Sequence, residues 1–295
     1  MTGFLAELGK KLADRWVALL VLPGLLFTAV AAAAVTLGQR HWADAGALTA
    51  LVGRVASTGA DRPDGLTRTV LLLVGLLVAS FASGMLARAL GVPVEHALAG
   101  RWPRPLRGVA GRLRERRRRA WTRADQRCRE ARDAGDRDAL GDLVRRRNGI
   151  ALIEPRCPTW IGDRLTAPAV RVRDEYGLDL GFAWPRLWLL LPESTRTPLT
   201  EGRRRLDDAT ALGGWALLYL ALGSVWWPAA VAGAAAGLVA WRRSRAAAAV
   251  YAELVEAAVD VHVGDLLDRF ADDSGVRPAR PQWGAELTER FRKGV

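Results

Sequence analysis

The chain has 295 residues and a formal net charge of +12, from 43 Lys and Arg against 31 Asp and Glu. Hydrophobic residues make up 50% of it, and many of them gather in three long uncharged runs separated by highly charged segments. The two cysteines, Cys128 and Cys157, exclude a disulfide framework and a cysteine-rich zinc site. Because roughly 18 consecutive apolar residues suffice for a transmembrane helix, we predict an all-α, polytopic integral membrane protein with four transmembrane helices.

The N-terminal quarter of the chain predicts two spans joined by a loop. Residues 1–15 form a short amphipathic lead-in, which we expect to lie along the cytoplasmic interface. Residues 16–37 form the first span, because their uncharged run is longer than the core of a signal peptide; cleavage of this run is the alternative. Residues 38–68 form an extracytoplasmic loop with turn-forming residues, and residues 69–87 form the second span.

The distribution of charge sets the predicted orientation. Residues 88–208 carry 27 Lys and Arg against 17 Asp and Glu. Their first arginines, Arg101, Arg104 and Arg107, follow the second span closely, where basic residues have most influence on topology. We therefore predict that residues 88–205 form a basic cytoplasmic helical domain. The protein is then a multi-pass protein of the cell membrane with both termini in the cytoplasm.

The third uncharged run, residues 209–241, is long for one span and short for two. Residues 224–228 interrupt it, and Trp226 and Trp227 are typical of a membrane interface. We interpret the run as a hairpin of two spans, residues 206–225 and 226–243; one long tilted helix and a re-entrant loop are the alternatives. Residues 244–275 predict a cytoplasmic amphipathic helix, and residues 276–295 predict a flexible tail.

The basic domain predicts several further helices. Residues 101–111 form a proline-containing linker, and helices over 112–133 and 139–147 form a helical hairpin of the coiled-coil kind, followed by a short strand at 150–153. Thr166 is the expected N-cap of a helix that ends at Gly177, and Thr197 is the expected N-cap of a helix that runs into the third span. The very apolar residues 187–191 are either a buried core element or an interfacial segment.

One block in this domain matches a pattern beyond its own periodicity. It consists of Pro158-Thr159-Trp160-Ile161-Gly162-Asp163-Arg164-Leu165, then Arg173, then Tyr176-Gly177-Leu178-Asp179, then Trp184-Pro185-Arg186-Leu187. The block resembles a family of uncharacterised bacterial multi-span membrane proteins, and the resemblance extends over the flanking spans. It implies the membrane topology and brings no known activity. Asp163 departs from the family pattern, which has Asn at this position.

A cluster of arginines is the strongest candidate binding site. A basic residue near an anionic bilayer contributes about 1 kcal/mol to binding. We predict that the cluster binds anionic membrane lipids or an acidic protein partner, and a solvated face that only fixes topology is the alternative. Nucleic acid is not expected, because Trp121 is the single aromatic residue among these charges. The cluster comprises Arg112, Arg114, Arg116, Arg117, Arg118 and Arg119.

Two ridges of small residues are candidate helix-packing surfaces. Small side chains at every fourth position let helix backbones approach closely inside a membrane. The ridges pack either within one subunit or between copies, and the second case would make the protein a homo-oligomer. They comprise Gly75, Ala79, Ser83 and Ala87 in the second span, and Ala229, Gly233 and Gly237 in the fourth.

The sequence contains no recognisable catalytic or cofactor motif. The spans carry no Asp, Glu, Lys or Arg well inside them, which argues against a coupled transporter. The three histidines, His41, His96 and His262, have no neighbours that complete a metal site, and there is no phosphate-binding loop or dinucleotide fingerprint. We therefore predict no metal, no cofactor and a non-enzymatic membrane anchor or scaffold. The alternative is a homo-oligomeric channel or pore-forming membrane effector.

Overall fold

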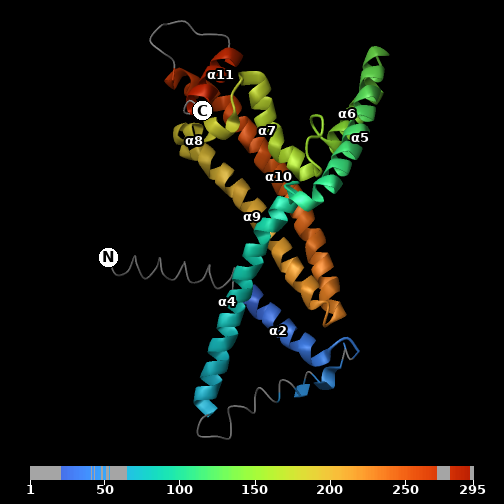
Figure 1. The fold of residues 1–295 in the computed structure, drawn as a ribbon, viewed down its shortest axis with the longest axis vertical. Helices are drawn as coiled ribbons and strands as arrows, with labels where there is room; N and C mark the ends of the chain where they lie inside the picture. The colour runs from blue at the N-terminus through green and yellow to red at the C-terminus, as the bar shows by residue number, and fades with distance from the viewer. Residues whose placement is uncertain are drawn as a thin grey trace, which may run out of the picture. The chain divides into compact units, whose positions relative to one another are not determined.

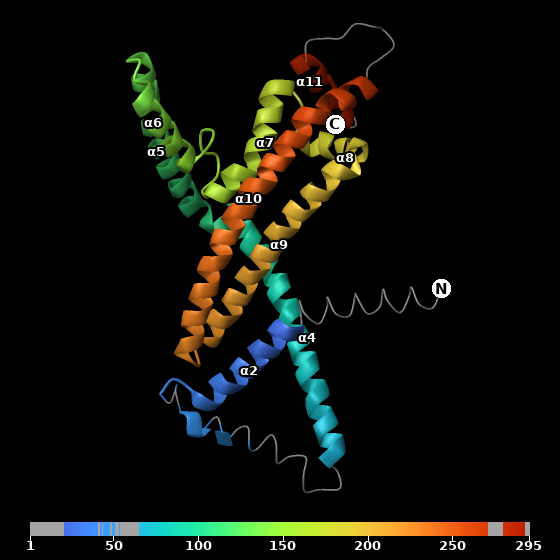
Figure 2. The same ribbon diagram turned by 180° about the vertical axis from the view of Figure 1, so that it is seen from behind.

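The computed structural model describes residues 21–40, 42, 44–47, 49, 50, 53, 65–270 and 280–292. Across these residues the regular structure is helical and contains no strand, which confirms the all-α prediction (Figures 1 and 2). The predicted strand at 150–153 is wrong, because residues 152–154 form bends after a helix. The lead-in at 1–15, the start of the first span and most of the loop at 38–68 lie outside the described residues.

The helices are longer than the sequence periodicity indicated. A 3-10 turn at Arg104–Leu106 precedes α5, so the predicted linker shrinks to a few residues. The segment labelled α4 continues past the predicted end of the second span at Ala87. The helices are α2 (Leu22–Leu37), α4 (Gly65–Leu98), α5 (Arg107–Asp133), α6 (Arg137–Ile150), α7 (Trp160–Tyr176), α8 (Leu180–Leu190), α9 (Glu193–Leu222), α10 (Trp227–Arg269) and α11 (Arg280–Phe291).

The chain divides into two compact units. The first, which we call the apolar unit, contains the described part of residues 1–94 together with residues 210–241. The second, which we call the charged unit, contains residues 95–209 and 242–295. The divisions fall inside α4, α9 and α10, each of which is a continuous helix.

The apolar unit packs through small residues. A Cβ added to Gly24 of α2 would lie 2.0 Å from the carbonyl oxygen of Ser80 in α4, and one added to Gly214 of α9 would lie 1.9 Å from that of Ala87. The ring of Phe27 lies 5.3 Å from the ring of Tyr219 in α9. The glycines therefore let helix backbones touch, so the large apolar side chains of these helices are left on the outside.

One helix among the described residues has the length and apolar composition to cross a membrane, the Thr69–Leu98 part of α4. A shorter apolar helix, Leu22–Leu37, corresponds to the predicted first span. Each apolar part of α9 and α10 continues directly into charged turns of the same helix.

The third uncharged run folds as a helical hairpin, and the single long helix is wrong. Helix α9 ends at Leu222 and α10 begins at Trp227, which is the break that the sequence predicted. The side-chain amide of Gln39 closes the turn by donating to the carbonyl oxygens of Gly223 and Ser224, at 3.1 and 2.9 Å. Its oxygen accepts from the backbone N–H of Trp227, at the first turn of α10. Gln39 thus satisfies backbone groups that both helix ends leave unpaired.

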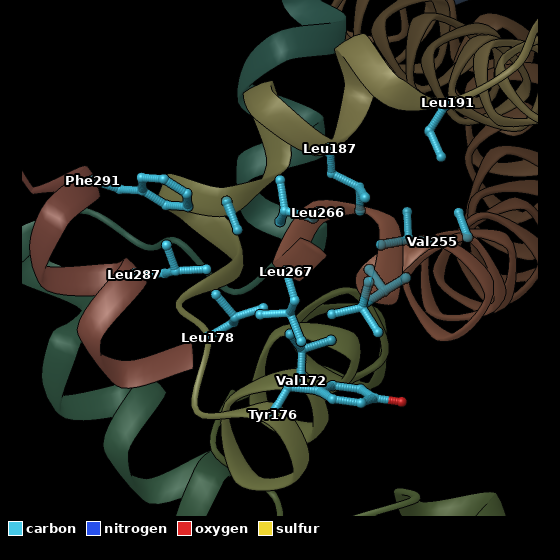
Figure 3. Packing of buried hydrophobic residues seen from close by; sticks show 14 of the residues in the cluster. Val172, Tyr176, Leu178, Leu187, Leu191, Val255, Leu266, Leu267, Leu287 and Phe291 are labelled. Carbon is cyan, nitrogen blue, oxygen red and sulfur yellow. The ribbon is translucent and has the colours of Figure 1, made fainter. Parts of the chain in front are cut away.

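The charged unit has a conventional hydrophobic core. Figure 3 shows side chains from α7, α8, α10 and α11 converging on it. The apolar segment at 187–191 belongs to this core through Leu187 and Leu191, while Leu189 on its other side is 80% exposed. The fully buried members include Val172, Leu178, Leu187, Leu191, Leu199, Val259 and Leu266.

Two predicted helix starts in this unit are wrong. Helix α7 begins at Trp160, where the Thr159 hydroxyl accepts from the backbone N–H of Gly162, so Thr166 lies inside the helix. Gly177 ends this helix as predicted, with a left-handed φ of 71°. Helix α9 begins at Glu193, so Thr197 also lies inside a helix. In both cases a Thr with a Pro one or two residues further on resembled a cap, but Pro168 and Pro198 both lie inside their helices.

The predicted flexible tail is wrong for residues 280–291, which form α11. Its Leu287 and Phe291 are 2% and 5% exposed and belong to the core. A Cβ on Gly284 would lie 1.8 Å from the carbonyl oxygen of Tyr176, so a glycine is required where α11 crosses the end of α7. A helix of this length is marginal alone and depends on such tertiary contacts.

Candidate functional site

The candidate site lies on the helical hairpin of α5 and α6, which lie side by side in both views (Figures 1 and 2). Gly135, with φ of 71°, makes the turn, and the carboxylate of Asp136 caps α6 by accepting from the N–H of Ala139. Cys128 is buried on the inner side of α5 at 1% exposure, so it is not a reactive surface thiol.

An ion-pair network holds the two arms of the hairpin together. The carboxylate of Asp125 accepts from Arg147 of α6 at 2.9 Å and from Arg129 at 2.7 Å. The hydrogen bond from Arg147 is the main reason that the pKa of Asp125 lies below its ordinary value. The guanidinium of Arg147 also lies 5.8 Å from the ring centre of Trp121, whose indole N–H donates to the carbonyl of Ala151.

A second buried carboxylate joins α5 to α7. Asp163 is 5% exposed; one oxygen accepts from Arg117 at 2.7 Å, and the other accepts from the backbone N–H groups of Arg156 and Cys157 at 2.8 and 2.7 Å. Burial, with the negative charge of Asp163 as the next cause, raises the pKa of the Cys157 thiol. Arg117 also donates to the carbonyl of Ile150 at 2.9 Å.

The residues around Asp163 fasten the end of α4 to the same junction. The Thr159 hydroxyl donates to the carbonyl of Leu98 at 2.6 Å. A Cβ on Gly162 would lie 2.4 Å from the carbonyl oxygen of Ala99, so only glycine allows this approach. The core of the block that resembles a membrane-protein family therefore has a structural role: it ties α4, α5 and α7 together.

The predicted arginine cluster does not form one surface. Arg117 is turned toward Asp163, and Arg118 pairs with Glu154. Arg119 pairs with Glu115 at 2.8 Å along the exposed side of α5. The remaining three, Arg112, Arg114 and Arg116, are exposed and have no ion pair within the described part of the chain.

A different set of arginines shares one side of α5. At 100° per residue, spacings of four, three, four and four residues keep five side chains within about 80° of one another. All five are exposed, and of these only Arg119 has a carboxylate partner among the described residues. Arg114 points to the opposite side of the helix. We call this set the arginine face, and it comprises Arg112, Arg116, Arg119, Arg123 and Arg127.

The predicted arginine cluster did not include Arg123 and Arg127, because it was defined by the densest run of charge and not by the helical period. The spacing itself was the available signal, since residues three and four apart are neighbours on a helix. The guanidinium of Arg123 donates to the backbone carbonyl of Arg119 at 3.1 Å, which aligns it with the face without neutralising it.

The small residues of the fourth predicted span pack within the chain. Ala229 is fully buried, and a Cβ on Gly233 would lie 2.7 Å from the backbone N of Leu220 in α9. A Cβ on Gly237 would lie 3.7 Å from Ala216.

The small residues of the second predicted span are buried at one end of the ridge and exposed at the other. Ala87 is fully buried against Gly214, and Ser83 is half-buried with its hydroxyl bonded to the carbonyl of Ser80. Ala79 is exposed, and a Cβ on Gly75 would have no described atom within 4 Å.

The described residues contain no group of three His, Cys, Asp or Glu side chains that could hold a metal ion. No family model, curated protein or solved structure matches this chain. The resemblance of the block at 158–187 to a membrane-protein family therefore stays a prediction.

Proposed function

We propose that this protein is a four-span membrane anchor, a non-enzymatic scaffold whose arginine face recruits an acidic protein partner to the cytoplasmic side of the cell membrane. The spans are residues 16–37, 69–87, 206–225 and 226–243, and both termini are cytoplasmic. The observation that carries the recruiting role is the arginine face of α5, in which four of the five exposed guanidiniums have no carboxylate partner among the described residues.

The exposed side chains of the apolar unit support membrane insertion. Large apolar residues are exposed on all four of its helices, for example Leu26 at 61%, Val78 at 62%, Leu217 at 42% and Val231 at 59%. Soluble monomers rarely expose contiguous apolar surface of this kind. Hydrocarbon would cover it without cost, and the positively charged residues that follow the spans favour a cytoplasmic location for the charged unit.

The shape and charge of the arginine face favour a protein as the partner. From Arg112 to Arg127 the face extends about 22 Å along α5. Glu130 continues the same side of the helix, so the face is basic for four turns and then acidic. A uniformly anionic bilayer would repel that end, whereas an acidic helix with one basic residue would complement it.

The test measures binding of the full chain, in nanodiscs of zwitterionic lipid, to a poly-glutamate peptide of about 20 residues. We expect the quadruple variant R112Q/R116Q/R123Q/R127Q to bind at least tenfold more weakly at 0.15 M salt. The control R114Q/R132Q/R137Q/R146Q removes the same charge from other exposed positions of the hairpin and is expected to lose less than threefold.

Equal losses in both variants would mean that net charge alone attracts the peptide, and the arginine face would be rejected as a site. Binding of the wild type to anionic vesicles, lost in the first variant while peptide binding is unchanged, would identify the partner as the membrane surface instead.

A homo-oligomeric channel is the second candidate function, favoured by the unused part of the α4 ridge. Gly75 and Ala79 are open to a neighbouring copy in the described structure. Light scattering of the purified protein, with the detergent mass subtracted, tests it. A closed assembly of four or more subunits would support a pore, and a monomer or dimer would contradict it.

A further inference from the structure

A groove runs between α9 and α10 within the charged unit, with a volume of about 370 Å³. Apolar residues line it, among them Gly202 and Ala209 of α9 and Ala246 and Val250 of α10, and we call these its floor. We call its charged lining residues, which include Arg205 and Arg243, its rim. The opposite side of the helix pair is closed, because Leu206 and Ala248 pack against Ile161 of α7. The groove is thus the open side of a helix pair whose other side is filled.

The two arginines on the rim are available to a ligand. Arg243 is exposed and has no ion pair within the described residues. Arg205 is 66% exposed and pairs with Glu201 at 3.2 Å, which is a surface pair of small energy. Asp208 also lines the groove and would oppose an anion, but Arg204 lies 3.9 Å from its carboxylate.

The floor suits a different chemistry from the rim. Glycine and alanine leave a shallow apolar trough that offers no side-chain hydrogen bonds, so it fits an aliphatic chain. Two guanidiniums fit a phosphate, which each can contact in a bidentate manner. In the sequence the helices that form the groove run directly into the uncharged residues 209–241, which are two of the proposed spans.

We propose that this groove binds one anionic phospholipid, with its phosphate between Arg205 and Arg243 and part of an acyl chain on the Gly202–Ala246 floor. The site rests on the proposed membrane insertion of the α9–α10 hairpin. It is separate from the arginine face, and it would fix the hairpin at the cytoplasmic leaflet, where anionic lipids are concentrated.

The experiment compares two neighbouring arginines of α10. Arg242 and Arg243 are both exposed, both lack an ion pair among the described residues, and only Arg243 lines the groove. The full chain is exchanged into neutral detergent with added phosphatidylglycerol, and the retained lipid is counted by native mass spectrometry. We expect R243Q to reduce the one-lipid complex at least fivefold and R242Q to change it less than twofold.

A filling variant separates a lipid from a free phosphate. Ala246 is exposed, so A246F fills the trough without removing charge or entering the core. Loss of phosphatidylglycerol in A246F supports the lipid. Binding of inorganic phosphate that R243Q weakens and A246F leaves intact would overturn the lipid and leave a phosphate site.

Equal losses in R242Q and R243Q would overturn the groove, because the lipid would then be held by general attraction. No lipid retained by the wild type would overturn it as well. Membrane insertion is tested apart, by resistance of the full chain to alkaline carbonate extraction. A chain that resists extraction and retains no lipid contradicts only the groove, whereas an extracted chain contradicts the proposed anchor.

Discussion

Helix α10 packs in opposite ways along its length. In residues 227–241 the buried side chains include Ala229 and Ala240, while Val231 and Leu238 are at least half exposed. In residues 242–269 the helix buries larger residues such as Val255, Val259, Val263 and Leu266. No break separates the two parts, so the change is one of side chains and not of backbone.

The contrast is the pattern expected of one helix with two different solvents, as the proposed membrane anchor requires. The second part follows the rule of a water-soluble protein, with an apolar stripe inside and acids such as Glu253 and Asp265 outside. The first part reverses it, since small residues face inward and large apolar ones outward. Hydrocarbon provides no drive to bury Val or Leu, so close contact between small residues becomes the way to hold helices together.

The largest expected effect comes from placing an arginine at an exposed apolar position of each unit and comparing how much of each variant stays in the membrane. An arginine at the centre of a transmembrane helix costs about 2.5–3.5 kcal/mol on insertion scales. We therefore expect V78R to lower the membrane-inserted fraction at least 50-fold, measured by carbonate extraction. L189R is the matched control, because Leu189 is the more exposed residue and lies in the charged unit. An equal membrane-inserted fraction in the two variants would contradict the difference between the exposed surfaces of the two units.

A truncation inside the core of the charged unit is the next test. Leu266 is 1% exposed, and L266A is expected to cost about 2–5 kcal/mol because it removes buried contacts and leaves a cavity. V261A, on the same helix at a position 71% exposed, should change stability by less than about 0.5 kcal/mol. Hydrogen exchange of peptides from residues 250–268 measures both, and similar exchange in both variants would contradict this core.

Asp163 tests whether the charged unit depends on its buried polar junction as well. D163A leaves Arg117 and two backbone N–H groups without their acceptor, and we expect a loss of about 2–4 kcal/mol. D163N keeps an oxygen for the N–H groups but loses the charge that Arg117 faces, so its loss should be about half as large. Hydrogen exchange over 150–165 distinguishes them; a D163N loss as large as that of D163A would mean that the charge dominates.

The sequence predicted features that depend on local pattern. The hairpin at 223–226 follows from Trp-Trp-Pro after an apolar run, and the α5–α6 hairpin follows from its charge spacing. The start of α7 depends on contacts of Thr159 and Gly162 with the end of α4, a segment some 60 residues earlier in the chain. Helix α11 depends on a core supplied by α7, α8 and α10. Its own composition resembles that of a flexible tail, so the sequence alone did not predict it as a helix.

The same limit applies to the candidate site. The density of arginines in the sequence identifies α5 as the candidate binding helix. The helical period then places Arg123 and Arg127 on a different side of this helix from Arg114. The partners of Arg117 and Arg118 are 46 and 36 residues distant. No local rule could therefore assign these two arginines to the junction and remove them from the binding surface.

The smallest expected effect concerns the pH dependence of the hairpin that presents the arginine face. The pKa of Asp125 is lowered in the folded protein, chiefly by its hydrogen bond from Arg147, from an ordinary value of 3.8. The stabilisation by this carboxylate is therefore fully present above about pH 4 and is lost as the pH falls through the lower folded value.

Hydrogen exchange of α6 peptides in the wild type and in D125N measures this stabilisation. We expect faster exchange in D125N at pH 6 and a ratio that approaches one as the pH falls through the folded pKa of Asp125, because protonation then removes the same charge from the wild type. A ratio that stays constant with pH would mean that the Asp125–Arg147 pair contributes nothing to holding the hairpin closed.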